Sequence, residues 1–331
     1  MTNLTRSVAG LVIMGLALAS LASSARAQQS ESQLTVTTES SRVHVFPTVD
    51  SAGQMAPLLG DPGPLLYHSG GQVMLPRVVA YAIFWVPPTL QTGGATGMSA
   101  LYQTIQKNLL TDYAGHSIGN NSTQYYQNIS ATKTYIKNLG GLGGFYADTR
   151  AYPASGCNDS FTPGNCLSDI QIQREVKHVM ALTGWTAGLN HIFLVFTSSG
   201  EGSCIGGACA YTSYCAYHGF FTTTSSTVIY TNQPYADLTK CQLPGAPSPN
   251  GDPYGDATAS IVSHELTESI TDPLINAWYT AQGNEIGDLC AYNYGTPTWD
   301  LGNANEVWNG DPYLLQQEFD NHVSGCVQVG P

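Results

Sequence analysis

The segment 256-DATASIVSHELTESITDP-273 encodes the helix around which we expect the rest of the chain to be organised. Asp256 is a residue type that caps helices and Pro273 is one that ends them, so a helix of about four turns is predicted between the two. Apolar residues recur along this helix at helical spacing, which predicts one face packed against a core. They are Ala259, Val262, Leu266 and Ile270. His264 and Glu268 lie one turn apart, on the opposite face.

The polar face of this helix carries the pattern H-E-x-x-E, one residue away from the zinc-binding motif H-E-x-x-H. In that motif two imidazoles hold zinc, and the glutamate after the first histidine is the general base. His264 and Glu268 are therefore candidate metal ligands, and Glu265 is the candidate base. Carboxylates also bind calcium, magnesium and manganese, so the expected cofactor is Zn²⁺, with Ca²⁺ or another divalent cation as the alternative.

A second acidic segment, 284-NEIGD-288, follows after a linker long enough to fold back on the helix. It resembles the segment that provides the third, glutamate ligand in thermolysin-like gluzincins. The resemblance implies that Glu285 completes the ligand set, with Asp288 as a supporting carboxylate next to the ligands. Asp272, one turn further along the helix, is a second supporting carboxylate. The alternative interpretation is a solvated acidic helix face, because so short a motif is common by chance.

The first part of the chain has the features of an export signal. Residues 1–27 combine a basic residue, Arg6, with an apolar stretch and an Ala-Arg-Ala cleavage site that ends at Ala27, which predicts a secreted or periplasmic protein. The apolar stretch is too short for a strong membrane span, so no membrane association is expected after cleavage. Residues 28–70 are polar and become rich in Pro and Gly, which predicts a flexible leader, a linker or a propeptide. Residues 71–331 are expected to form a single domain.

The composition is strongly acidic, with 11 basic and 23 acidic residues and a net charge of −12. Removal of the signal peptide takes away two arginines and makes the net charge −14. A chain this acidic repels nucleic acid and anionic lipid, so neither is expected as a partner. The oligomeric state does not follow from the sequence.

An even number of cysteines in an exported chain predicts disulfide bonds. The eight candidates are Cys157, Cys166, Cys204, Cys209, Cys215, Cys241, Cys290 and Cys326. Cys157 and Cys166 are expected to form a local bridge, and Cys326 is expected to reach either Cys290 or Cys241. The three cysteines between positions 204 and 215, together with His218, could instead form a zinc knuckle, although their spacing fits no standard pattern.

Hydrophobic runs of strand length occur at residues 73–86, 191–196 and 227–230, and amphipathic helical patterns at residues 98–113 and 169–182. These elements and the helix with the candidate ligands predict an α/β (α+β) fold. We expect a mixed sheet, a zincin-like active-site helix and stabilisation by disulfide bonds.

Two blocks of sequence carry a further resemblance. Residues 204–219 are rich in cysteine and end in His-Gly, and residues 263–290 contain N-A-W-Y and E-I-G-D-L-C. Together they resemble the EXORDIUM or phosphate-induced protein 1-like family of exported proteins of plants and microbes. The resemblance extends over about residues 73–330. Many plant members are discussed as cell-wall or growth-related proteins, so the resemblance alone does not imply catalysis.

Two functions are compatible with these patterns. The first is a secreted zinc metallopeptidase acting on a peptide or protein, in which Glu265 takes a proton from metal-bound water. The alternative is a non-catalytic exported cell-wall or carbohydrate-binding module of EXORDIUM type, which would bind polysaccharide through aromatic rings after the helix. These rings belong to Trp278, Tyr279, Tyr292, Tyr294, Trp299 and Trp308.

Overall fold

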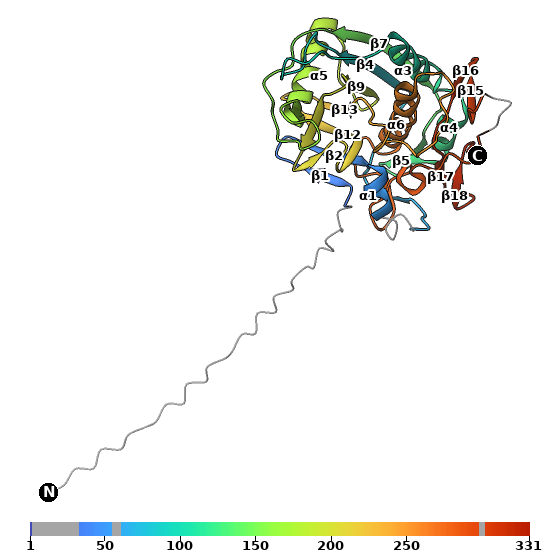
Figure 1. Ribbon diagram of the computed structural model, residues 1–331. Helices are drawn as coiled ribbons and strands as arrows, with labels where there is room; N and C mark the ends of the chain where they lie inside the picture. The colour runs from blue at the N-terminus through green and yellow to red at the C-terminus, as the bar shows by residue number, and fades with distance from the viewer. Residues whose placement is uncertain (2–32, 55–60, 298–301) are drawn as a thin grey trace. The chain divides into compact units, whose positions relative to one another are not determined.

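The computed structural model describes residue 1 and residues 33–54, 61–297 and 302–331 (Figure 1). Apart from Met1, the predicted signal peptide lies outside these described residues. The described residues from position 33 onward belong to one structural unit. Within the described part of the chain, no helix is both long enough and apolar enough to cross a membrane.

A seven-stranded sheet occupies the middle of this unit, with the strand order β1-β2-β12-β13-β9-β4-β7. Neighbouring strands from β13 to β7 pair in parallel, and those from β1 to β13 pair antiparallel. The predicted mixed sheet is therefore confirmed. In the order of the sheet, the strands are β1 (Thr35–Thr37), β2 (Ser41–Pro47), β12 (Tyr214–Thr222), β13 (Thr227–Gln233), β9 (His191–Thr197), β4 (Val78–Trp85) and β7 (Gly140–Asp148).

Helices cover both faces of the sheet (Figure 1). The side chains of β9 alternate between the two faces, as expected for a buried strand. Leu194 packs in the core cluster that contains residues of α3 (Ala100–Asp112) and α6 (Pro253–Thr271). Val195 packs in the cluster that contains residues of α5 (Asp169–Thr183). The sheet is thus the middle layer of three, and α6 lies on the same face as α3.

The remaining described elements are short and form small sheets or single turns. The helices are α1 (Val49–Gln54), α4 (Ser117–Asn121), η1 (Ser122–Gln124) and η2 (Asp288–Cys290). The strands are β3 (Leu66–Tyr67), β5 (Tyr126–Ile129), β6 (Thr132–Tyr135), β8 (Cys166–Ser168), β10 (Gly202–Ile205), β11 (Ala208–Cys209), β14 (Trp278–Tyr279), β15 (Glu306–Trp308), β16 (Asp311–Tyr313), β17 (Glu318–Asp320) and β18 (Gly325–Val327).

Helix α6 ends at Thr271, as predicted, but it begins earlier than Asp256. Its cap is Asp252, whose side chain accepts a hydrogen bond from the backbone N–H of Gly255 at 3.0 Å. Pro253 follows at the first helical position, where a missing N–H costs nothing. The carboxylate of Asp256 instead accepts hydrogen bonds from the preceding loop, so it fixes that loop against the helix.

Part of the range expected to be a leader lies inside the sheet. Strand β2 pairs with β12, and its residues Val43, Val45 and Phe46 are buried. The interpretation as a flexible segment is therefore wrong for residues 35–47, because the apolar side chains of β2 belong to the core. Removal of this segment as a propeptide stays a prediction.

All eight cysteines form disulfide bonds, which join Cys157 to Cys166, Cys204 to Cys209, Cys215 to Cys241, and Cys290 to Cys326. The predicted local bridge is confirmed, and the partner of Cys326 is Cys290. The alternative of a zinc knuckle is wrong, because each of its three cysteines is already bonded to another sulfur.

Candidate metal centre

Helix α6 packs against strands β2 and β12, and histidines from both strands face it. His44 of β2 and His218 of β12 are direct partners in the antiparallel register, so both side chains leave the same face of the sheet. Their ring centroids are 5.8 Å apart. The pairing places two imidazoles beside the acidic side chains of α6.

The segment around Glu285 and Asp288 folds back onto α6, as the sequence suggested. The backbone N–H of Gly287 donates to Glu268 Oε1 at 3.2 Å, and that of Glu285 donates to Asp288 Oδ2 at 2.6 Å. A Cβ at position 287 would lie 2.4 Å from Nδ1 of His264, so only glycine permits this close approach.

Seven side chains meet at this point, and we call them the buried cluster: His44, His218, His264, Glu265, Glu268, Glu285 and Asp288. Each is only 0–1% exposed. The side of α6 that the alternative interpretation placed in solvent is therefore buried like the apolar side, because β2, β12 and the returning segment cover it.

Two groups of potential ligands share Glu268. In each group, one ligand atom from every member lies within 4.8 Å of the others. The first group is His44, Glu268 and Asp288, and the second is His218, Glu268 and Glu285. His264, the histidine of the expected ligand set, lies close by: its Nε2 is 3.2 Å from Glu268 Oε2 and 4.0 Å from Asp288 Oδ1.

Many polar atoms of the cluster are buried without a hydrogen-bond partner among the described residues. A buried polar atom without a partner costs roughly 1–3 kcal/mol, and more if it is charged. Folded proteins therefore rarely tolerate several such atoms together, unless an ion or water satisfies them. The atoms are Nε2 of His218 and His264, Oε1 of Glu265, Oε2 of Glu268, both carboxylate oxygens of Glu285, and Oδ1 of Asp288.

Protonation can partly balance these charges when no cation is bound. Burial alone lowers the pKa of His218, but hydrogen bonds and charges from Glu265 and Glu268 raise it to about 9. The pKa of His264 is raised to about 10 in the same way, against the effect of burial, mainly by Glu268. Burial and the neighbouring carboxylates raise the pKa of Glu285 well above its ordinary value. Protons and cations therefore compete for the same atoms.

Glu265 and Asp272, two residues expected at the site, make contacts that the sequence did not predict. Glu265, the candidate base, places its Oε2 3.1 Å from Nδ1 of His218, so this carboxylate is held by a histidine. Asp272 accepts hydrogen bonds from the backbone N–H groups of Asn276, Ala277 and Trp278. It therefore fixes the chain that leaves α6.

The ring orientations of two histidines are set by neighbouring polar groups. Thr35 Oγ1 lies 3.2 Å from Nδ1 of His44. The side-chain amide of Gln316 donates to the carbonyl oxygen of Gly287 at 3.0 Å, and the same nitrogen lies 2.8 Å from Nδ1 of His264. Such contacts to the other ring nitrogen are typical of histidines at metal sites.

Sequence reasoning missed His44 and considered His218 only beside the cysteines. The available signal for His44 was the alternation of polar and apolar residues in 41-SRVHVFP-47, which is typical of a strand. It also missed Glu318, whose two carboxylate oxygens are buried without a hydrogen-bond partner among the described residues. Burial raises the pKa of Glu318 well above its ordinary value, while the charge of His264 opposes this shift.

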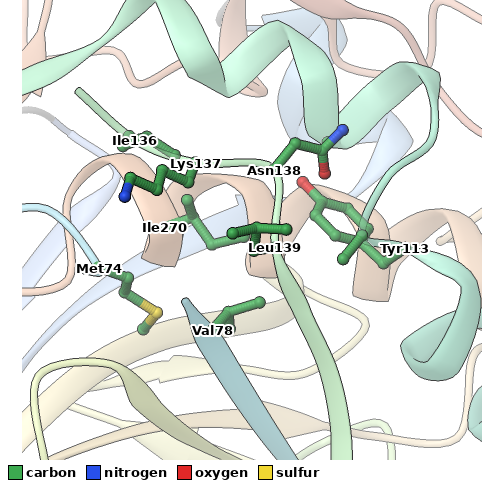
Figure 2. A pocket seen from close by; sticks show the side chains of 10 residues that line it. Met74, Val78, Tyr113, Ile136, Lys137, Asn138, Leu139 and Ile270 are labelled. Carbon is green, nitrogen blue, oxygen red and sulfur yellow. The ribbon is translucent and has the colours of Figure 1, made fainter. Parts of the chain in front are cut away.

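Three cavities between described residues are lined by other side chains. The one in Figure 2, beside Tyr113 and Ile270, has a volume of about 10 Å³, which is room for about one water molecule. A cavity of about 170 Å³ is lined by residues that include Arg150 and Glu175. A third, of about 130 Å³, lies in the loop before α6. None of the three is lined by a residue of the buried cluster, so none of them is an entrance to it.

The aromatic residues proposed to bind sugar are partly core residues. Trp278, Trp308 and Tyr292 are 6%, 1% and 8% exposed. Trp278 packs against Tyr126, with ring centroids 5.0 Å apart. Trp299 lies outside the described residues. The three buried rings therefore stabilise the fold and offer no stacking surface to a sugar.

The fold and the site define a disulfide-stabilised mixed α/β protein with a buried cluster of histidines and carboxylates. Over 99 residues, the chain is 47% identical to protein EXORDIUM-like 3 of Arabidopsis thaliana, a match that covers 25% of this chain and 29% of that protein. Over 52 residues it is 46% identical to protein EXORDIUM-like 5 of the same plant, with 14% of each chain covered.

These matches support the resemblance to EXORDIUM-like proteins, although each spans less than a third of the relative's length. No protein-family model and no solved structure matches the chain. The comparisons give no support to the resemblance to zincins.

Proposed function

We propose that this chain is a non-catalytic exported protein of EXORDIUM type, in which divalent cations bound by the buried cluster stabilise the core. One observation carries the proposal: seven histidine and carboxylate side chains meet in the core and are 0–1% exposed, and most of them have polar atoms without a hydrogen-bond partner among the described residues. A cation supplies the missing interactions, and its binding free energy then adds to the stability of the folded state.

The chemistry of the donors favours a transition metal. Calcium and magnesium take oxygen ligands almost exclusively, whereas imidazole nitrogen suits zinc and its neighbours. The cluster offers His44, His218 and His264 together with carboxylates. Zn²⁺ is therefore the cation that we propose first.

Burial also argues against the peptidase that the H-E-x-x-E pattern suggested. A peptidase needs a cleft in which a peptide carbonyl reaches the metal-bound water. The side chains of the cluster are 0–1% exposed, and Glu265 is engaged by His218. A buried cation that a substrate does not reach can stabilise the fold but cannot act on that substrate.

The four disulfide bonds support the proposed export. Disulfides form and persist mainly in oxidising compartments, and this chain has four of them. The signal-like features of residues 1–27 support the same proposal.

The test compares metal content and thermal stability for wild type and Glu268→Gln, with Glu201→Gln as a matched control. Glu201 is equally buried, but it bonds to Gln91, outside the cluster. We expect bound cation in wild type and in the control, and a melting temperature that a chelator lowers in both. At a free cation concentration 1,000 times the Kd, binding stabilises by about 4 kcal/mol. Glu268→Gln should lose the cation and the response.

A folded wild type that contains no metal and is insensitive to chelators would refute the structural role. A peptidase screen of wild type beside Glu265→Gln tests the absence of catalysis. Hydrolysis by wild type that Glu265→Gln abolishes would overturn the non-catalytic assignment in favour of the metallopeptidase.

A further inference from the structure

We propose that the buried cluster holds two divalent cations, bridged by the carboxylate of Glu268. This inference rests on the metal binding proposed above and specifies how many ions bind and which side chains hold each. Glu268 belongs to both ligand groups, while the other members of the groups differ. One cation is assigned to His44 and Asp288, and the other to His218 and Glu285.

The positions of the histidines favour two ions over one. His44 and His218 leave adjacent strands side by side, with ring centroids 5.8 Å apart. Glu285 spans the space between them: its Oε1 is 3.6 Å from Nδ1 of His44, and its Oε2 is 3.6 Å from Nε2 of His218. In two-metal sites the ions are about 3.5–4 Å apart.

The balance of charge leads to the same number. The cluster contains four carboxylates, from Glu265, Glu268, Glu285 and Asp288. One divalent cation with neutral histidines leaves two negative charges in a region without solvent, and each uncompensated buried charge costs several kcal/mol. Two divalent cations make the sum of these four charges zero. The sum leaves out Asp272 and Glu318, two further buried carboxyl groups whose charges act on the cluster.

Five of the seven unpartnered atoms belong to the two groups, while His264 Nε2 and Glu265 Oε1 belong to neither. Asp288 Oδ1 belongs to the first group, and Nε2 of His218 and both oxygens of Glu285 belong to the second. Glu268 Oε2, also unpartnered, is the oxygen that lies 3.4 Å from His218 Nδ1. A single ion at either group would leave unpartnered atoms in the other.

The experiment measures the number of cations per chain in the full-length mature protein, by elemental analysis and by titration of Zn²⁺ into the chelator-treated protein. We expect two equivalents for wild type and one each for His44→Gln and His218→Gln. Glu268→Gln should fall below one. His178→Gln is the matched control, because His178 is partly exposed and lies outside the cluster, and it should keep two.

A measurement on wild type alone covers the case in which a variant does not fold. With Mn²⁺ in place of Zn²⁺, electron paramagnetic resonance should show the spectrum of a coupled manganese pair. One equivalent, with the spectrum of an isolated Mn²⁺, overturns the bridged pair and leaves the proposed metal-binding function standing. No bound cation in folded wild type overturns both.

Discussion

Replacing Asp169 should lower the stability of the folded protein more than most substitutions, although Asp169 is not part of the buried cluster. Its carboxylate is buried at the start of α5 and accepts four hydrogen bonds. Oδ1 accepts from the hydroxyls of Tyr217, at 2.9 Å, and Tyr230, while Oδ2 accepts from Ser41 Oγ at 2.6 Å and Gln173 Nε2 at 2.7 Å. This one side chain therefore joins α5 to β2, β12 and β13.

The magnitude follows from the groups that lose their acceptor. In Asp169→Ala, the fully buried hydroxyls of Tyr217 and Tyr230 have no acceptor, and each such group costs about 1–3 kcal/mol. We expect a loss of about 4 kcal/mol. Asp169→Asn keeps one oxygen for the two hydroxyls, and we expect it to lose about 1–2 kcal/mol.

Urea unfolding under non-reducing conditions measures both losses. With a slope of roughly 3 kcal/mol per molar, Asp169→Ala should lower the midpoint by about 1.3 M. Asp50→Ala is the control, because Asp50 is 62% exposed and pairs with Lys240 at the surface, where a salt bridge contributes little to stability. If Asp169→Ala costs no more than this control, the reasoning from buried acceptors is refuted. Metal content should not change, because Tyr217 and His218 point to opposite faces of β12.

Two further predictions concern the site and the dependence on pH. Gly287→Ala places a methyl group against the ring of His264. The substitution should displace that ring and lower both the metal content and the melting temperature, without changing any candidate ligand. Unchanged values would mean that the segment around position 287 shifts freely. Burial, together with the carboxyl group of Asp148 and against the charge of Arg150, raises the pKa of Glu175 from 4.5 to about 8. The folded state then binds more protons than the unfolded state between these values, so this contribution to stability is lost as pH rises from about 5 to 9. Glu175→Gln should show a smaller fall in melting temperature over that interval, and equal falls would contradict the prediction.

The helix with His264 and Glu268 could be predicted because its signals are local. Apolar spacing and Pro273 define its length, and the segment with Glu285 follows close enough to fold back. Its beginning was misplaced because Asp252 and Asp256 are both capping residue types, and only the loop contacts of Asp256 distinguish them.

The histidine pair could not be predicted, because it depends on strand pairing across the sheet. His44 and His218 meet through the register between β2 and β12, and nothing near either residue specifies the other. The disulfide of Cys215 and Cys241 shows the same limit, since the local cysteine pattern also allowed a metal site. Local periodicity therefore predicted individual helices and strands, whereas the pairing of distant strands determined which residues meet in the buried cluster.

The cluster draws on residues from His44 to Asp288, which are 244 positions apart and yet joined by a hydrogen bond. Its candidate ligands lie together because β2 pairs with β12 and the segment around Glu285 folds over α6. An ion bound in this cluster would enter and leave through openings of the core, so its exchange would be slow. The metal found in the purified protein would then reflect which ions were present in the compartment where the chain folded.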